Sequence, residues 1–353
     1  MHICFMAFRL ELEYLKLRFN FSARTSRGKM DDRGIWLIRF FDERDSTIKG
    51  IGEVAPLEGL SLETETQVKA ELDRLIQEVE SLSGNLVNAD EVLEHISISR
   101  YASSVIFGLE MAVRDYFNGG KGIFFNSDFL TGKKIPINGL VWMADGNSML
   151  VQARKKVNEG FGCIKLKVGG LQFEEECRLL DALRKEFQDR IVIRLDANGA
   201  FNETDVWDRL NRLSDFGPES IEQPIKAGQQ DLMAEVCKSS PIPIALDEEL
   251  IGVRSKLERG RLLDIIAPSF VVIKPGLHGG FLGAREWIAL AEEKRIGWWI
   301  TSALESSIGL SAIAQFTALY KGNRVHGLGT GGIYENNLPS ALKAESGYLC
   351  IQP

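Results

Sequence analysis

The sequence predicts an α/β protein in which an N-terminal α+β unit precedes a (β/α)7β, TIM-like barrel. Three observations carry this prediction. The 353 residues are enough for two domains. The first third changes from a strand period to a helix period, and the remainder alternates short apolar strands with amphipathic helices. We expect one unit at 1–134, the barrel at 135–330, and a C-terminal segment, 331–353, that returns to the first unit.

The first third combines strands and helices. Apolar and polar residues alternate over 8–21, with one slip at Tyr14 that predicts a bulge or bend. A second strand pattern covers 35–41, before a glycine-rich turn at 50–52. Apolar residues then recur at helical spacing over 68–79 and 105–116. Strands followed by helices indicate an α+β unit.

The remaining sequence repeats with a period of about one βα unit. Helical runs, among them 173–187, 204–216, 281–294 and 308–319, connect the strands in seven strand-helix units. The segment after the last strand is too short and turn-rich for an eighth regular helix. Eight parallel strands favour a closed barrel. The strands are predicted at 135–141, 162–168, 191–196, 220–223, 242–247, 270–274, 298–302 and 325–328.

The composition excludes several classes of protein. Hydrophobic residues make up 44% and charged residues 26%, which is typical of a folded globular chain. The net charge of −7 argues against a nucleic-acid partner. The chain begins without a signal-peptide pattern and lacks a long apolar run, so we expect no membrane partner and a cytoplasmic location. The five cysteines have no zinc-binding spacing, and we expect reduced, mostly buried thiols.

Charged residues stand where the predicted barrel strands end. Lys165 and Lys167 end one strand, and the next four strands end at Asp196, Glu222, Asp247 and Lys274. From Lys167 onward, each lies about one βα unit beyond the previous residue. Because barrel active sites form at the carboxyl ends of the strands, we expect these side chains to converge at one mouth.

The three acids at this mouth predict a metal site. Asp196, Glu222 and Asp247 offer hard oxygen ligands that suit Mg²⁺, with Mn²⁺ as a substitute, and no histidine or cysteine accompanies them. Without a cation, three converging carboxylates would repel one another. Any one of these acids alone is as well explained by a solvated loop or an arginine partner. Three such acids at the ends of successive strands favour the interpretation as metal ligands.

The lysines predict a general base. Lys165 and Lys167 are two residues apart on a strand, so both point to the same side. Two adjacent ammonium groups disfavour double protonation, which lowers the pKa of at least one. Lys274 approaches from the opposite wall, although a lone strand-end lysine is often a surface group. A metal between lysines suits proton abstraction from a carbon α to a carboxylate, so we expect a small-molecule carboxylate as partner.

At these positions the chain resembles the enolase superfamily, in particular its muconate-lactonizing subgroup. The matching motifs are Lys165-x-Lys167, Asp196-x-Asn198, Glu222-Gln223-Pro224, Asp247-Glu248 and Lys274-Pro275. The resemblance implies an α+β capping domain over the barrel. Its implied roles are Mg²⁺ ligands for Asp196, Glu222 and Asp247, the base for Lys167, its electrostatic neighbour for Lys165, the opposite cation for Lys274, and support of the ligands for Asn198 and Glu248. Phe201 stands where many relatives have tryptophan.

Within that subgroup, the seventh strand region and the residues after it resemble dehydratases of menaquinone biosynthesis. The resemblance implies loss of water from a succinyl-bearing hydroxycyclohexadiene carboxylate, with Lys167 removing the α proton. The uncharged end at Ser302 suits an anionic or neutral substrate tail. Loops around Arg27 and Pro56 resemble those that close over the barrel mouth, which makes Ser302, Arg27 and Pro56 candidate substrate contacts. Such loops are as often plain flexible surface.

Three alternatives stay open. An N-acylamino acid racemase or dipeptide epimerase would use Lys167 and Lys274 as two bases, and the residues above do not exclude it. A muconate-type cycloisomerase is the second alternative. The third is a catalytically silent barrel that serves as a scaffold, against which the complete set of ligands and lysines argues. The oligomeric state, including a homo-oligomer, is left open.

Overall fold

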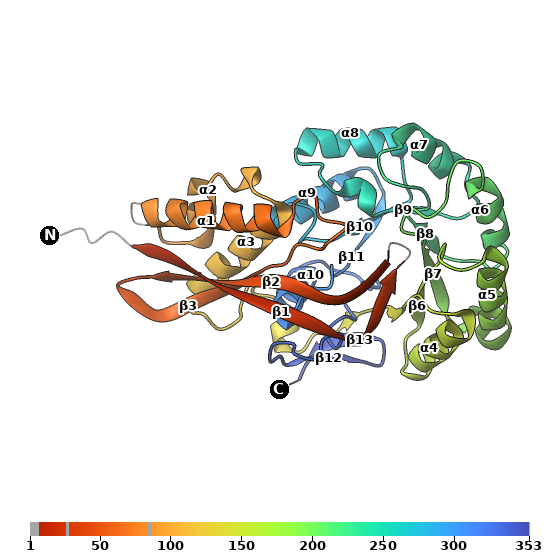
Figure 1. Cartoon of the computed structure of the whole chain (residues 1–353), viewed down its shortest axis with the longest axis horizontal. Coiled ribbons are helices and arrows are strands. Elements are labelled where there is room, and N and C mark those ends of the chain that lie inside the picture. Colours follow the sequence, from red (N-terminus) through yellow and green to blue (C-terminus); the bar gives the residue numbers. More distant parts are fainter. Residues whose placement is uncertain (1–6, 26–27, 83–85, 353) are drawn as a thin grey trace.

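The computed structural model describes residues 7–25, 28–82 and 86–352. Its first part is an antiparallel sheet in the order β1-β2-β3, with helices packed against it (Figure 1). Apolar residues of the two long helices face the sheet, as their helical spacing predicts. The elements are β1 (Phe8–Thr25), β2 (Gly28–Asp42), β3 (Asp45–Val54), α1 (Glu65–Ser81), α2 (Ala89–His95) and α3 (Ser103–Phe117).

The expected bulge at Tyr14 is wrong. Tyr14 pairs with Trp36 in an uninterrupted register, and the register shifts between Arg18 and Ala23 instead. The alternation of apolar and polar residues slips at Tyr14 for another reason: the strand changes the face that it buries. Phe8 packs into the core beneath the helices, whereas Leu17 packs on the opposite face with the C-terminal region. One strand therefore serves two cores.

The second part is a parallel sheet in which β5 to β11 are neighbours in chain order, with helices around the outside (Figure 1). The helix predicted at 173–187 coincides with α5, and the other three named runs agree with α6, α9 and α10 to within two residues at each end. The elements are β5 (Gly139–Val141), α4 (Gly146–Asn158), β6 (Cys163–Lys167), α5 (Phe173–Phe187), β7 (Val192–Asp196), α6 (Val206–Ser214), β8 (Ser220–Glu222), α7 (Gln230–Ser239), β9 (Ile244–Leu246), α8 (Lys256–Ile266), β10 (Phe270–Ile273), α9 (Gly280–Glu293), β11 (Gly297–Ile300) and α10 (Ser307–Thr317).

The predicted eighth strand is reduced to isolated bridges. His326 forms a parallel bridge with Ile137, and Gly327 forms one with Thr301. These partners adjoin β5 and β11, the two edge strands of the sheet. The first predicted strand is also divided into two. Its first part, β4 (Ile135–Pro136), belongs to a separate small sheet, and only β5 belongs to the parallel sheet. The described sheet therefore has seven strands rather than eight.

The C-terminal segment contacts both parts of the molecule. Its hairpin, β12 (Leu342–Glu345) and β13 (Tyr348–Ile351), forms a small antiparallel sheet with β4 at the start of the second part. Before the hairpin, Tyr334 bridges the backbone of Phe19 in β1, and the Asn336 side chain bonds the backbone of the same strand. The segment therefore contacts both the first sheet and β4, which leads into the parallel sheet.

Two carboxylates of the first part cap helices of the second. Glu53 of β3 accepts hydrogen bonds from Ser306 N (2.8 Å) and Gly309 N (2.9 Å) at the start of α10. Glu110 of α3 accepts from Phe281 N (2.5 Å) and Leu282 N (3.0 Å) at the start of α9. Both helix termini present free N–H groups that favour a negative charge. These contacts lock the two parts together.

Glu110 predicts a pH dependence of stability. Burial raises the pKa of Glu110 to about 7, against an ordinary value of 4.5. The pKa of Glu110 is higher in the folded than in the unfolded chain. The stabilisation that the protonated Glu110 side chain gives to the fold is therefore complete below about pH 4.5 and is lost as the pH rises through 7. We expect Glu110→Gln to remove on the order of 3 kcal/mol of the pH dependence of the unfolding free energy. Urea unfolding at pH 5 and pH 8 measures it.

The surface control for this comparison is Glu186→Gln, since Glu186 pairs with Arg154 on the outside of the barrel. The control is expected to retain the pH dependence of the unmodified chain. Equal pH dependence in the Glu110 variant and the unmodified chain would contradict the assignment.

The described cysteines agree with the expectation of reduced, mostly buried thiols. Cys163, Cys177 and Cys350 are buried, Cys237 is half-buried, and all four are free. Cys4 lies outside the described residues. In the part of the chain that the structure describes, no helix has the length and apolar character needed to cross a bilayer.

Candidate active site

Six charged side chains lie together where the parallel strands end. Lys165 and Lys167 belong to β6, Asp196 ends β7, and Glu222 ends β8. Lys167, Asp196 and Glu222 stand at one level, because they are register partners across the three strands. Asp247 and Lys274 directly follow β9 and β10. All six are at most 9% exposed, which is rare for charged groups unless they are paired.

Each lysine of this cluster pairs with an acid. Lys165 Nζ donates to Glu222 Oε2 at 2.5 Å and lies 2.8 Å from Asp196 Oδ2. Lys167 Nζ donates to Asp196 Oδ2 at 2.6 Å and to Asn198 Oδ1 at 2.8 Å. Lys274 Nζ donates to Asp247 Oδ2. The predicted residues are therefore brought together from five strands.

Asn198 and Glu248 stand behind this cluster. Asn198 holds the Lys167 ammonium with its Oδ1 and donates its Nδ2 to Glu248 Oε1 at 3.1 Å. The Asn198 backbone N–H also donates to Asp196 Oδ1 at 3.1 Å. Both residues thus orient groups of the site.

The pKa values of the two neighbouring lysines are shifted in opposite directions. Burial and the adjacent Lys165 ammonium lower the pKa of Lys167, despite the opposing pull of Asp196. Burial also acts against the charge of Lys165, but Asp196, Glu222 and Asp247 outweigh it and raise the pKa of Lys165. The pair therefore consists of a persistent cation and a lysine that more readily gives up its proton, as a general base requires.

The acids also differ from one another. Burial raises the pKa of Glu222 to about 7. For Asp196 and Asp247, burial acts in the same direction, but the lysine ammoniums outweigh it and lower the pKa of both acids. Glu222 is consequently the carboxylate whose charge is least compensated by its surroundings.

The acids of the cluster offer oxygen ligands to a divalent cation. In the described chain, no three acidic, histidine or cysteine side chains already hold a metal-binding geometry, because the lysine ammoniums take one oxygen of each acid. The other oxygens of Glu222 and Asp247, Oε1 and Oδ1, are buried and have no hydrogen-bond partner among the described residues. Buried polar atoms without partners are costly. Hard oxygens in this position fit Mg²⁺.

Four residues of the cluster, Lys165, Lys167, Asp196 and Lys274, line a cavity of about 320 Å³, a volume suited to a small molecule. Its walls come from the first part of the molecule and from the barrel rim. Besides Lys165, Lys167, Asp196, Asn198 and Lys274, it is lined by Gly28, Lys29, Met30, Leu57, Glu58, Gly59, Leu60, Asn138, Leu140, Trp142, Trp299, Thr301, Ser302, Ala303, Leu304, Gly327, Gly329 and Thr330.

The three candidate substrate contacts differ in their position relative to the cavity. Ser302 lines the cavity, and its Oγ lies 2.6 Å from Thr330 Oγ1. Pro56 does not line it, since its carbonyl accepts from Arg33 Nε and the following residues 57–60 face the cavity instead. The path of this loop, which the sequence pattern does not specify, brings residues 57–60 rather than Pro56 to the cavity. Arg27 lies outside the described residues.

Sequence reasoning missed the buried charges at the junction of the two parts. Arg33 of β2 is 5% exposed, Glu53 is fully buried, and Glu305 is 1% exposed. Burial raises the pKa of Glu305 to about 7. One feature of the sequence could have pointed to them: each is an ionisable residue within, or next to, an apolar run. Arg33 and Glu53 interrupt the apolar pattern of a strand in this way. Their partners could not be found this way.

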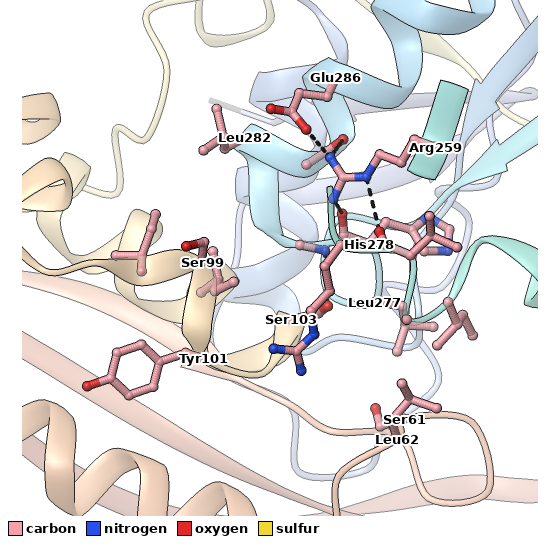
Figure 2. A pocket seen from close by; sticks show the side chains of 18 of the residues that line it. Ser61, Leu62, Ser99, Tyr101, Ser103, Arg259, Leu277, His278, Leu282 and Glu286 are labelled. Atoms are coloured by element: carbon pink, nitrogen blue, oxygen red, sulfur yellow. Dashed lines mark hydrogen bonds and ion pairs between the residues drawn. The ribbon is translucent and has the colours of Figure 1, made fainter. Parts of the chain in front are cut away.

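A second hollow, of about 120 Å³, is lined by residues of both parts of the molecule and by none of the three lysines (Figure 2). Arg259 dominates it, but its guanidinium is committed to Glu286 and to the backbone carbonyls of Val253 and His278. It therefore braces α8 against the loop that follows Lys274. This hollow offers a ligand no comparable set of buried acids and lysines.

Comparisons with known proteins identify relatives of this chain. A family model described as Enolase C-terminal domain-like matches residues 148–351. The o-succinylbenzoate synthase of Desulfotalea psychrophila is 43% identical, over 97% of this chain and 99% of that protein. The crystal structure of MenC from the same organism has a TM-score of 0.87 at 39% identity, covering 98% of this chain and 100% of that one.

Other relatives are more distant. An L-amino acid-D/L-Glu epimerase of Francisella philomiragia is 32% identical, but over 45% of this chain and 44% of that protein. The family match over more than half of the chain, with a full-length relative beside it, shows that the chain belongs to the enolase superfamily.

Proposed function

We propose that this enzyme is an o-succinylbenzoate synthase, a lyase that removes water from 2-succinyl-6-hydroxy-2,4-cyclohexadiene-1-carboxylate in menaquinone biosynthesis. The observation that carries the proposal is the 43% identity to an o-succinylbenzoate synthase over nearly the whole of both chains. The epimerase, at 32% identity, aligns over less than half of this chain. The buried lysines that line the cavity supply the chemistry.

In this reaction Lys167 acts first. As a neutral amine it takes the proton from the ring carbon that bears the carboxylate, and the electron pair moves into the enediolate. Lys274, across the cavity, places an ammonium beside the developing negative charge. The enediolate then expels the neighbouring hydroxyl, which takes the proton from the Lys167 ammonium and leaves as water. The ring becomes aromatic, which drives the step.

Asp196, Glu222 and Asp247 would hold Mg²⁺, with Mn²⁺ as a substitute, and Asn198 and Glu248 would orient the site around it. The bound ion would offset the second negative charge of the enediolate. Lys165 remains charged and keeps the pKa of Lys167 low by repulsion. Ser302 and the uncharged wall beside it would receive the succinyl tail.

Two organisational proposals accompany this function. The bridges of His326 and Gly327 support a sheet that closes into a (β/α)7β barrel, with the unit at 1–134 as its cap. The contacts of Tyr334 and Asn336 with β1 support a C-terminal segment, 331–353, that ties the barrel to this cap.

An absorbance assay for aromatic product tests the function. We expect the cyclohexadiene substrate to aromatise in the presence of Mg²⁺, and this activity to disappear with a chelator and return with Mg²⁺ or Mn²⁺. A parallel incubation of N-succinylamino acids in D₂O measures α-hydrogen exchange. Exchange without aromatisation would replace the proposal with an N-acylamino acid racemase, which would use Lys167 and Lys274 as two bases.

A further inference from the structure

We infer that Arg33, a residue outside the catalytic cluster, positions the cavity wall that selects the substrate tail. This inference rests on the proposed function for the identity of the tail. Arg33 lies in β2 and is 5% exposed. Its guanidinium donates to the backbone carbonyls of Ala55, Pro56 and Ala303. One side chain of the first part therefore binds a loop of its own part and a loop of the barrel rim.

Both loops held by Arg33 continue into the cavity wall. Beyond Pro56, residues 57–60 line the cavity, and beyond Thr301 so do residues 302–304. Their apolar side chains meet in one cluster, in which buried Leu57 and Ala303 contact partly buried Leu60 and Leu304. This wall thus contains an apolar cluster that spans both parts of the molecule, beside the polar Glu58 and Ser302, and Arg33 holds the backbone of both of its loops.

The barrel loop needs such support because its backbone is strained. Leu304 has a φ of 64°, a left-handed conformation that non-glycine residues rarely adopt. Strained residues of this kind persist where several contacts fix them. Here Arg33 holds Ala303 O, Tyr334 Oη donates to Leu304 O at 2.6 Å, and Ala303 N donates to Glu305 Oε2 at 2.7 Å.

The charge of Arg33 is matched locally. Glu305 lies within electrostatic range of Arg33, and Glu53, which caps α10, lies within range of Glu305. A buried guanidinium with acids beside it and three carbonyl acceptors is a fixed element, because moving it would leave charges and carbonyls unsatisfied. Lysine cannot replace it, since an ammonium lacks the planar fork that reaches several carbonyls at once. Arg33 is therefore a positioning residue that does not touch the reacting atoms.

The test compares Arg33→Lys with Arg39→Lys, a control on the same strand whose arginine pairs with Glu13 at the surface. Competition experiments measure binding of o-succinylbenzoate and of benzoate, which lacks the tail. We expect Arg33→Lys to weaken o-succinylbenzoate binding by about ten-fold or more, and benzoate binding by about two-fold at most. KM should rise more than kcat falls. The control variant should bind both ligands with unchanged affinity.

Tyr334→Phe is a second variant that removes one bond to the same loop and leaves the Arg33 side chain in place, and it is expected to weaken binding of the two ligands in the same unequal way. Hydrogen exchange at residues 303–306 should accelerate in both variants, whereas exchange in β10 should not. Equal losses for both ligands, or unchanged exchange in the loop, would overturn the inference. If the unmodified enzyme does not aromatise the cyclohexadiene, the proposed function fails, while the exchange measurement still decides the role of Arg33.

Discussion

Replacing Lys167 with alanine is expected to lower kcat by about 10³- to 10⁴-fold, because the variant has no amine to take the α proton. The enzyme should keep its fold and its affinity for Mg²⁺, since the three acids remain. Steady-state aromatisation kinetics, circular dichroism and Mg²⁺ titration measure these three properties. The matched control is Lys156→Ala, a surface lysine that pairs with Glu159 on α4. A Lys167 variant with kcat near that of the control would remove Lys167 from the mechanism.

The same residue determines the expected pH profile. Because the pKa of Lys167 is lowered, the neutral base forms below the ordinary lysine pKa of about 10.4. Activity should therefore rise with pH along a limb whose midpoint lies below that value. A limb at or above 10.4 would contradict the role of burial and of Lys165 in lowering this pKa.

Replacing Asp247 with asparagine is the change with the second largest expected effect. The variant loses a charged ligand oxygen, and it also loses the carboxylate that holds Lys274. We expect Mn²⁺ affinity to fall by more than about 100-fold and aromatisation to fall with it. Titration followed by electron paramagnetic resonance measures the bound Mn²⁺.

The control for the metal measurement is Asp264→Asn, an exposed acid on α8 that pairs with Lys294. It should leave Mn²⁺ affinity unchanged. If Asp247→Asn binds Mn²⁺ as tightly as this control, Asp247 is not a ligand and the metal site must be built from other residues.

The sequence by itself determined the order of the elements and the set of charged residues at the strand ends. Periodicity identified α5 correctly, because an amphipathic helix needs only local spacing to reveal its buried face. The spacing of Asp196 and Glu222 by one βα unit was equally informative. In a parallel sheet, such a repeat brings residues to the same level, and the two are register partners in the structure.

Only the tertiary structure decided which groups become partners. The pattern at Tyr14 recorded a change of buried face, yet it was indistinguishable from a bulge until both cores were known. Likewise, the path of one loop placed Leu57 rather than Pro56 in the cavity, and the contact between Arg33 and Ala303 joins residues that are 270 positions apart. Periodicity reports the environment of a side chain along its own element, whereas long-range contacts depend on how separate elements pack. For that reason the chemistry of the site was readable from the chain, and the support behind its walls was not.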